Sequence, residues 1–277
     1  MSTAIDALAE SRGQASQVTA APQKRTALVT GASFGIGAAI ALELARDGFE
    51  LAVTARRADN LRDVLGRLKT SGIRVTAVEL DLRSAASLDR AVDAAIAALG
   101  HVDVLVNNAA MPFRKAAVDV TLDEWNAVIE TNVAGTFFLC QKIARHLIAG
   151  GRQGCIVNMA STHGVVGHAG VSVYGISKAA IIHMTKMLAV EWAQHGIRVN
   201  AVAPGTVETQ SRAAILADGE FRQSILSKVP LHRFGTPEEV AAAVRYLASP
   251  VAGYVTGEVL LLDGGVCACG SRGVGPK

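Results

Sequence analysis

The stretch that decides the fold is TALVTGASFGIGAAIALELARD, residues 26–47. It begins with a β-branched and apolar run that predicts a strand, and it ends with an amphipathic run that predicts a helix. Gly31, Gly35 and Gly37 stand where the strand must turn into the helix. Glycines at such a turn let the backbone approach a pyrophosphate, which accepts hydrogen bonds from the free N–H groups at the helix start. The stretch therefore predicts nucleotide binding at the end of the first strand.

The same alternation of short apolar runs and longer amphipathic runs continues along the chain. Strands are expected at residues 26–30, 50–54, 74–80, 102–107, 155–160, 198–203 and 258–262, and helices at 36–47, 59–70, 87–99, 122–148, 174–195 and 237–247. This alternation implies right-handed βαβ crossovers and a parallel sheet with helices on both faces. The predicted fold class is α/β, with a single doubly wound Rossmann-type domain over residues 25–266 and a seven-stranded parallel sheet. An irregular segment is expected from Pro204 to Thr236, and a segment of that length is usually functional.

The composition excludes several classes of protein. Half of the 277 residues are apolar and 18% are charged, as in a soluble globular protein with a large core. The net charge of +3 is small and its lysines and arginines are dispersed, so no nucleic-acid partner is expected. No apolar stretch is long enough to span a bilayer, so no membrane partner is expected. Four cysteines do not form a disulfide framework in a chain of this length, which favours a reducing, cytoplasmic compartment.

The two ends of the chain are expected to lie outside the domain. Residues 1–24 lack the apolar core of a secretion signal and are interpreted as a disordered leader, the alternative being a short arm that docks on a neighbouring subunit. Residues 267–277 are Gly-rich and are interpreted as a flexible tail. Cys267 and Cys269 are too sparse for a metal site, so no metal is expected.

A second stretch, SVYGISKAAI at residues 172–181, places Tyr174 and Lys178 four positions apart, on one face of the first turn of a helix. Lowering the pKa of a tyrosine from about 10 by about three units requires about 4 kcal/mol. A lysine cation ~4 Å away supplies about that amount at an effective dielectric near 20. Tyr174 is therefore a candidate general acid/base, the alternative being a tyrosine that only packs at a helix start. Ser161 follows a strand, so it lies at the edge where parallel sheets bind ligands.

These motifs, in this order, resemble the classical branch of the short-chain dehydrogenase/reductase family. The matches are TGASFGIG (30–37) to TGxxxGxG, NNAA (107–110) to NNAG with Ala110 in place of glycine, NVAG (132–135), a serine thirteen residues before the tyrosine, YGISK (174–178) to YxxxK, PGTVET (204–209) and LDGG (262–265). The resemblance covers residues 25–265 and implies an oxidoreductase that transfers hydride between a nicotinamide cofactor and a secondary alcohol or ketone. Two alternatives are a catalytically silent cofactor-binding sensor or scaffold, and an epimerase or dehydratase of the extended branch.

The resemblance also implies roles for individual residues. The implied catalytic residues are Asn132, Ser161, Tyr174 and Lys178. The implied cofactor-binding residues are Gly31, Ser33, Phe34, Gly35, Ile36, Gly37, Arg56, Arg57, Asp81, Leu82, Asn108, Ala109, Tyr174, Lys178, Pro204, Gly205, Val207 and Thr209. In the family pattern Lys178 also holds the nicotinamide ribose, and Asn132 holds a helix kink and a water that connects Lys178 to solvent. Asp81 is implied to face the adenine amino group, with helix capping as the alternative.

The substrate side is less defined by the sequence. Phe113, His163 and His168 are candidate substrate residues, the alternative being solvated loop side chains, and residues 210–233 are expected to close over the substrate. The small-molecule carbonyl or alcohol substrate belongs to an open set that includes 3-oxoacyl thioesters, sugar acids or polyols, and ring ketones. Arg114 and Arg212 favour an anionic substrate, the alternative being plain surface charges.

The second strand indicates which cofactor is preferred. It ends in AVTARRADN, and Ala55 stands where an NAD-selective relative has an acidic residue. Arg56 and Arg57 follow, and a guanidinium forms charge-assisted hydrogen bonds with a 2′-phosphate. NADP(H) is therefore favoured, with NAD(H) as the alternative and Phe34 as a counter-signal.

A homotetramer is the expected assembly, since the family commonly associates through the helices at 122–148 and 174–195. Those two helices carry apolar residues beyond one stripe. They are Val133, Phe137, Phe138, Leu139 and Ile143 on the first helix, and Ile181, Ile182, Met184, Met187, Leu188 and Trp192 on the second.

Overall fold

The computed structural model describes residues 24–210 and 217–269. Its strands are β1 (Thr26–Val29), β2 (Glu50–Ala55), β3 (Val75–Glu79), β4 (Val104–Asn107), β5 (Gly154–Met159), β6 (Ile197–Pro204) and β7 (Val259–Leu262). They form one parallel sheet in the order β3-β2-β1-β4-β5-β6-β7. The predicted seven-stranded, doubly wound sheet is confirmed.

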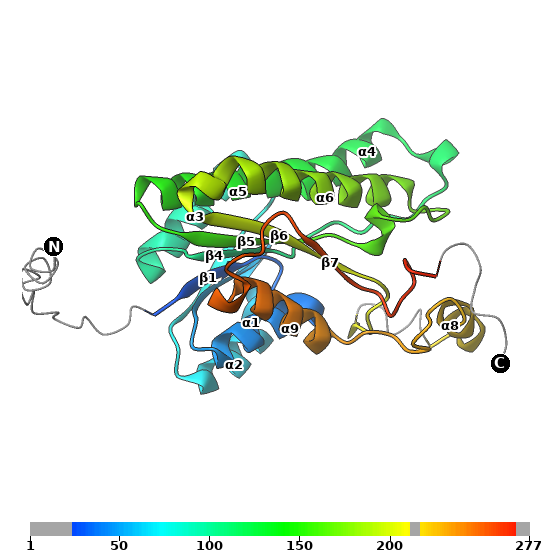
Figure 1. The fold of residues 1–277 in the computed structure, drawn as a ribbon, viewed down its shortest axis with the longest axis horizontal. Helices are drawn as coiled ribbons and strands as arrows, with labels where there is room; N and C mark the ends of the chain where they lie inside the picture. Colours follow the sequence, from blue (N-terminus) through cyan, green and yellow to red (C-terminus); the bar gives the residue numbers. More distant parts are fainter. Residues whose placement is uncertain (1–23, 211–216, 270–277) are drawn as a thin grey trace, which may run out of the picture.

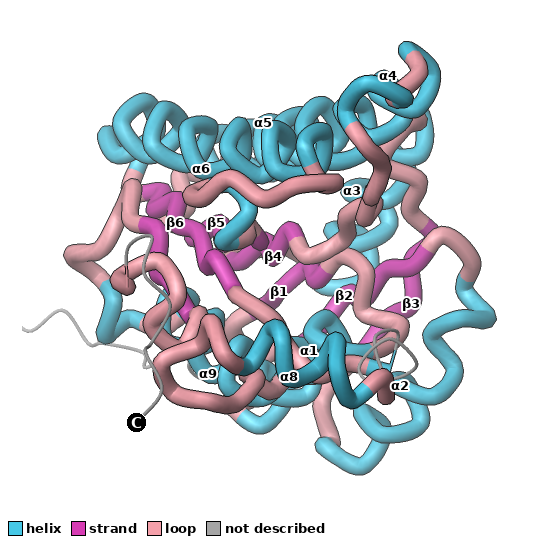
Figure 2. Tube along the Cα trace, turned by 90° about the vertical axis from the view of Figure 1, so that its right-hand side faces the viewer, coloured by secondary structure: helices cyan, strands magenta, loops and turns pink. Residues whose placement is uncertain are grey.

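Helices cover both faces of this sheet (Figure 1). They are α1 (Gly35–Arg46), α2 (Arg62–Leu68), α3 (Ala85–Leu99), α4 (Leu122–Ile129), α5 (Gly135–Ala149), α6 (Ser172–Trp192), α8 (Gly219–Leu226) and α9 (Pro237–Ala248). Figure 2 looks onto the edge where the strands end, with α3, α5 and α6 above the sheet and α1, α2 and α9 below it. The strand order reverses between β1 and β4, and such a switch point is where open parallel sheets bind ligands.

Each face of the sheet has its own core. Ile40 and Leu44 of α1 pack into the core of one face, and Leu139 and Ile143 of α5 pack into the core of the other. All four side chains are at most 1% exposed. The strands between these cores are buried along their whole length, because both of their faces are covered, which is why they do not alternate between apolar and polar residues.

Three predicted elements differ from the observed ones. The helix predicted at 122–148 is interrupted by a π-helical turn, Glu130–Ala134, between α4 and α5. The helix predicted from residue 174 begins at Ser172, and its last turn, Ala193–His195, is 3-10. The segment predicted to be irregular contains α8, whose residues, GEFRQSIL, include only three large apolar side chains and so give a weak periodic signal.

The predicted leader and tail lie mostly outside the described residues, as does Arg212. Lys24, the last residue of the predicted leader, forms an ion pair with Glu50 at 3.7 Å. At the other end, the backbone N–H of Cys267 donates to the Asp263 carboxylate at 2.7 Å. The described start of the predicted tail is therefore tied to the domain through β7.

Candidate active site

The glycine turn owes its shape to its three glycines in different ways. Gly31 and Gly35 have φ values of +65° and +58°, which residues with a Cβ rarely adopt. A Cβ on Gly37 would collide with the Gly31 carbonyl oxygen, so this glycine allows α1 to pack against the turn. A Cβ on Gly35 would lie 3.4 Å from the Thr209 side chain. Only Gly35 therefore keeps space open between the turn and the segment after β6.

The start of α1 is suited to an anionic ligand. Its N-cap residue is Phe34, and no side chain accepts a hydrogen bond from the first N–H groups. By contrast, α3, α4 and α9 are each capped by a hydroxyl, from Ser84, Thr121 and Thr236. The first N–H groups of an uncapped helix are free to bind a phosphate, and the helix dipole favours negative charge there. The described residues therefore fit the pyrophosphate of a dinucleotide.

Asn108 holds the glycine turn from the end of β4. Its Nδ2 donates to the carbonyl oxygens of Thr30 and Gly31, both at 3.0 Å. The Thr30 hydroxyl in turn accepts the backbone N–H groups of Asn108 and Ala109, both at 3.0 Å. Asn108, expected as a cofactor-binding residue, therefore organises the backbone of the glycine turn. Thr30 was missed by the sequence analysis, and only its place directly before the first glycine marks it.

At the other end of the site, β2 ends at Ala55, one residue beyond the predicted strand. Arg56 is exposed and lines the cavity, whereas Arg57 does not line it. Asp81 also lines the cavity, and its Oδ1 accepts the backbone N–H of Arg83 at 3.0 Å. The helix that follows is capped by Ser84, so Asp81 stabilises the turn before the helix rather than the helix itself.

Tyr174 and Lys178 lie together in the first turns of α6. The Lys178 ammonium is 5.6 Å from the centre of the Tyr174 ring. It is 3% exposed and donates to the Met159 carbonyl oxygen at 2.7 Å. Desolvation lowers the pKa of Lys178 from 10.5 to about 8. At neutral pH the ammonium form therefore remains the major one, and a cation faces the phenol ring.

Ser161 directly follows the fifth strand and its loop residue Ala160, and it begins a 3-10 turn, Thr162–Gly164. Its Oγ accepts the backbone N–H of His163 at 3.2 Å. No described residue accepts the proton of this hydroxyl, so the proton is available to a ligand in the cavity that Ser161 lines.

Asn132 lies in the π-helical turn, where the resemblance implies a kink. Its side chain is 1% exposed and its Oδ1 accepts the backbone N–H of Met111 at 2.7 Å. Its Nδ2 donates to the Met111 carbonyl oxygen and to the Ser177 hydroxyl, both at 3.0 Å. Ser177 then donates to the Tyr174 carbonyl oxygen at 2.7 Å. Ser177 was missed by the sequence analysis; it is fully buried and connects Asn132 to the backbone of the catalytic helix.

A cavity of about 770 Å³ joins these parts. All the implied cofactor residues except Arg57 line it, together with Ser161. The other lining residues are Thr54, Ala55, Asn60, Leu80, Arg83, Ala110, Met111, Pro112, Thr131, Met159 and Ala160. Asn132 lies behind the cavity wall and acts through its contacts. Phe113, His163 and His168 do not line the cavity.

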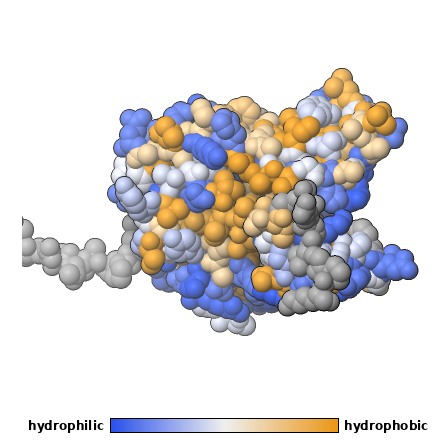
Figure 3. Space-filling model, turned by 45° about the vertical axis from the view of Figure 1, so that its right-hand side comes forward, coloured by the Kyte–Doolittle hydropathy of each residue, from blue (hydrophilic) through white to orange (hydrophobic). Residues whose placement is uncertain are grey.

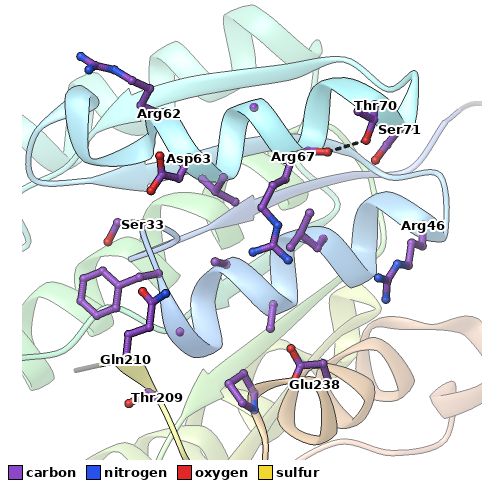
Figure 4. Close-up of a pocket in the computed structure, with 18 of the residues that line it drawn as sticks. Ser33, Arg46, Arg62, Asp63, Arg67, Thr70, Ser71, Thr209, Gln210 and Glu238 are labelled. Atoms are coloured by element: carbon purple, nitrogen blue, oxygen red, sulfur yellow. Dashed lines mark hydrogen bonds between the residues drawn. The ribbon is translucent and has the colours of Figure 1, made fainter. Parts of the chain in front are cut away.

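A second, open groove of about 1160 Å³ adjoins this cavity and shares Ser33, Phe34, Gly35 and Thr209 with it. Figure 4 shows side chains of α1, α2 and α9 around the groove. The charged residues that line it are Arg46, Arg62, Arg67, Asp63, Glu208 and Glu238. Charges of both signs are balanced there, so the groove is not built for an anion.

Comparison with known proteins agrees with this site. Residues 31–267 match the family model described as enoyl-(acyl carrier protein) reductase. The chain belongs to the short-chain dehydrogenase/reductase family. Within this family, it is 38% identical over 245 residues to the 3-oxoacyl-(acyl-carrier-protein) reductase of Aquifex aeolicus, covering 88% of this chain and 98% of the relative.

Two other members are sugar-acid enzymes. The chain is 34% identical over 240 residues to gluconate 5-dehydrogenase of Gluconobacter oxydans, covering 87% of this chain and 93% of the relative. The structure of a gluconate 5-dehydrogenase from Burkholderia cenocepacia, in complex with NADP and tartrate, is similar with a TM-score of 0.83 at 31% identity, covering 88% and 96% of the two chains. This short-chain dehydrogenase/reductase is thus an NAD(P)-dependent oxidoreductase that acts on alcohol and carbonyl groups.

Among residues 24–210 and 217–269, no group of three or more His, Cys, Asp or Glu side chains is arranged to hold a metal ion. None of the helices in the described part of the chain combines the length and the apolar character that a membrane span requires.

Proposed function

We propose that this enzyme interconverts a secondary alcohol and a ketone with NADP(H), using Tyr174 as the general acid/base. One observation carries the proposal: a single cavity is lined by the glycine turn before α1 and by Ser161, Tyr174 and Lys178. A dinucleotide on the turn and a carbonyl group beside Ser161 would therefore share one cavity, as direct hydride transfer between them requires.

The proposed reduction adds one hydride and one proton to the ketone, and the oxidation removes both from the alcohol. A nicotinamide held in the cavity that Tyr174 and Lys178 line would supply the hydride for reduction and take it up in oxidation. Tyr174 donates its phenolic proton to the carbonyl oxygen, and the phenolate left behind is stabilised by the Lys178 ammonium. The Ser161 hydroxyl donates a hydrogen bond to the same oxygen as negative charge grows on it. In oxidation Tyr174 accepts the proton of the alcohol.

Asn132 and Ser177 are proposed to position this machinery. Asn132 joins the loop after β4 to α6 through Met111 and Ser177, and Ser177 fixes the backbone at Tyr174. Both N–H groups of the Asn132 amide are used in these contacts. A water on the route from Lys178 to solvent would therefore bind at a carbonyl oxygen of this segment rather than at the amide nitrogen.

The test is Tyr174→Phe, which keeps the ring and removes the transferable proton. We expect turnover to fall by a factor on the order of 10² to 10⁴ while the Kd for NADPH changes less than about threefold. Steady-state rates and fluorescence titration measure the two quantities. Tyr246→Phe, on the exposed face of α9, is the matched control. A Tyr174→Phe enzyme with more than about a tenth of wild-type turnover would exclude the proposed role and would favour the silent cofactor-binding alternative.

Preference for NADP(H) rests on the end of β2. Ala55 presents no carboxylate there, and the exposed Arg56 lines the cavity beside it. The only carboxylate that neighbours this strand end in the described sheet is Glu79, which pairs in register with Ala55 and accepts the N–H of Ala58 at 2.9 Å. The related Burkholderia structure holds NADP. Among the described residues Arg56 forms no ion pair, and such a guanidinium favours the cofactor that carries the additional phosphate.

We also propose a homotetramer. Phe138 and Met187 are 47% and 58% exposed, and Ile176 and Val190 on α6 are 49% and 83% exposed. A separate group of exposed apolar residues, Tyr246, Val251, Tyr254 and Leu261, follows from α9 to β7. Figure 3 shows hydrophobic side chains gathered in the middle of the face below the upper helical layer. Two distinct apolar surfaces are what a tetramer with two kinds of two-fold interface requires.

The burial of the helices corrects part of the expected interface. Leu139, Ile143, Ile181, Leu188 and Trp192 are at most 7% exposed within one chain, because they pack on the sheet. Light scattering at micromolar concentration tests the tetramer. We expect Met187→Glu to halve the assembled mass, whereas Val118→Glu, at a 92% exposed residue that belongs to neither α5 nor α6, leaves it unchanged. A monomeric wild-type protein would rule the tetramer out.

A cytoplasmic location is proposed from cysteine usage. Burial raises the pKa of the Cys140 thiol to about 12 and that of Cys155 to about 11. Buried thiols with raised pKa values pack as small apolar groups and are inert, which suits a chain without structural disulfides.

A further inference from the structure

Two segments of the chain that border Tyr174 and Ser161 contain basic but no acidic residues. No aspartate or glutamate occurs between Glu130 and Glu191, a span that includes α5, β5, the Ser161 loop and α6. None occurs at residues 104–118 either, where the chain leaves β4 beside the site. The same segments contain lysine, arginine and histidine. An excess of basic side chains attracts ligands of negative charge.

Two histidines, His163 and His168, lie next to Tyr174 and to each other. The His163 ring stands edge-on to the Tyr174 ring, with their centres 6.1 Å apart and an interplanar angle of 88°. The His168 ring lies 5.3 Å from the His163 ring. His163 is half-buried and His168 is exposed, so the pair leads from Tyr174 outward to solvent. Neither ring lines the cofactor cavity, although the His163 ring contacts the Tyr174 ring, which does line it.

Arg114 reaches the same place from the loop after β4. The backbone N–H of Lys115 donates to the Gly170 carbonyl oxygen at 2.9 Å, which ties this loop to the histidine loop. A Cβ on Gly170 would lie 4.0 Å from the Arg114 Cγ. Lys115 is neutralised by Glu124, with both carboxylate oxygens at 2.9 Å. In the described part of the chain Arg114 has no acidic partner, so its charge is available to a ligand.

We propose that Arg114, His163 and His168 form a carboxylate-binding subsite, and that the substrate is a hydroxy acid or the corresponding oxo acid. This assignment rests on the proposed function, since it places the carboxylate beyond Tyr174 and the reacting carbon between Tyr174 and Ser161. A guanidinium binds a carboxylate through two parallel hydrogen bonds, and an imidazole N–H adds another. One guanidinium charge matches the single charge of a carboxylate, whereas a phosphate dianion would leave excess negative charge.

The test compares each acid with its neutral amide on the enzyme saturated with NADP(H). The pairs are tartrate and tartramide, gluconate and gluconamide, and lactate and lactamide. Binding is measured by calorimetry and turnover by kcat/KM. We expect at least one acid to bind at least tenfold more tightly than its amide. Arg114→Gln and His168→Gln each weaken binding of that acid at least fivefold and leave its amide and NADPH unchanged.

Arg90→Gln is the matched control, because it removes the same charge from an exposed position on α3. It is expected to change neither ligand. The subsite is overturned if acids and amides bind equally well, or if all three variants lose the same amount of affinity for the acid. Turnover of neutral ketones would in that case still support the proposed function. If instead the acids bind in a way that depends on Arg114 but no compound is turned over, the subsite is supported and the proposed function is contradicted. Because Arg114 and His168 are exposed, the variants are expected to fold, and unchanged NADPH affinity verifies it.

Discussion

Lys178 and Arg56 are two cations that line the same cavity in opposite environments. Lys178 is 3% exposed, sits behind Tyr174 and has a backbone carbonyl as its described partner. Arg56 is exposed at the end of β2. Burial penalises the charged form of Lys178 and lowers its pKa to about 8, whereas an exposed guanidinium keeps its hydration. The charge proposed for catalysis is thus held by the fold at a cost in stability, and the charge proposed for cofactor selection costs almost none.

The largest effect expected from this contrast is on stability as a function of pH. The pKa of Lys178 is about 8 in the folded protein, below its ordinary value of 10.5. Between these values the unfolded chain binds the proton that the folded protein has released, so the free energy of unfolding rises with pH. The burial of the cation therefore costs up to about 3 kcal/mol at lower pH, since a pKa lowered by one is equivalent to about 1.4 kcal/mol.

Lys178→Met measures this cost. We expect the free energy of unfolding of the wild type, minus that of the variant, to increase by about 3 kcal/mol between about pH 7.5 and pH 10.5. Urea unfolding of both proteins without cofactor, at one fixed protein concentration, gives the difference. Lys186→Met, an exposed lysine on the same helix, is the control and is expected to show no such trend. A difference that stays flat or falls with pH would mean that Lys178 is not desolvated.

The next effect concerns cofactor choice. We expect the wild type to prefer NADP(H) over NAD(H) at least tenfold in kcat/KM, and Arg56→Ala to lose at least tenfold of that ratio. A charge-assisted hydrogen bond of about 1.5–3 kcal/mol accounts for a change of this size. Arg57→Ala, which removes the same charge from a residue outside the cavity, is expected to change the ratio less than threefold. Equal or better use of NAD(H) by the wild type would contradict the assignment, and an unchanged ratio in Arg56→Ala would remove Arg56 from it.

The sequence was sufficient for the fold because local signals agreed with the global arrangement. The alternation of runs predicted the sheet, and the glycines predicted its first turn. The proximity of Tyr174 and Lys178 could be predicted, because a helix brings residues four positions apart onto one face. The contacts of Asn132 with Met111 and Ser177 were not readable, since they join residues 21 and 45 positions apart that only the folded sheet brings together. The exposed face of α6 was also misjudged, because apolar residues on both sides of a helix do not tell which side packs on the sheet.

The smallest effect separates the two cations by their response to salt. Screening acts on exposed charges, and the Debye length falls from about 10 Å at 0.1 M to about 3 Å at 1 M. In 1 M KCl we expect the wild-type preference for NADP(H) to fall about two- to fivefold, because the exposed Arg56 guanidinium would be screened from the 2′-phosphate. The turnover number at saturating cofactor should change less than twofold, because ions do not reach the buried Lys178. In Arg56→Ala the preference for NADP(H) should no longer depend on salt, and the turnover number should remain independent of salt. Measuring both quantities across the salt series in both proteins decides it: a turnover number that falls in parallel with the preference would show that salt reaches Lys178, and that the two cations do not differ in the way their burial indicates.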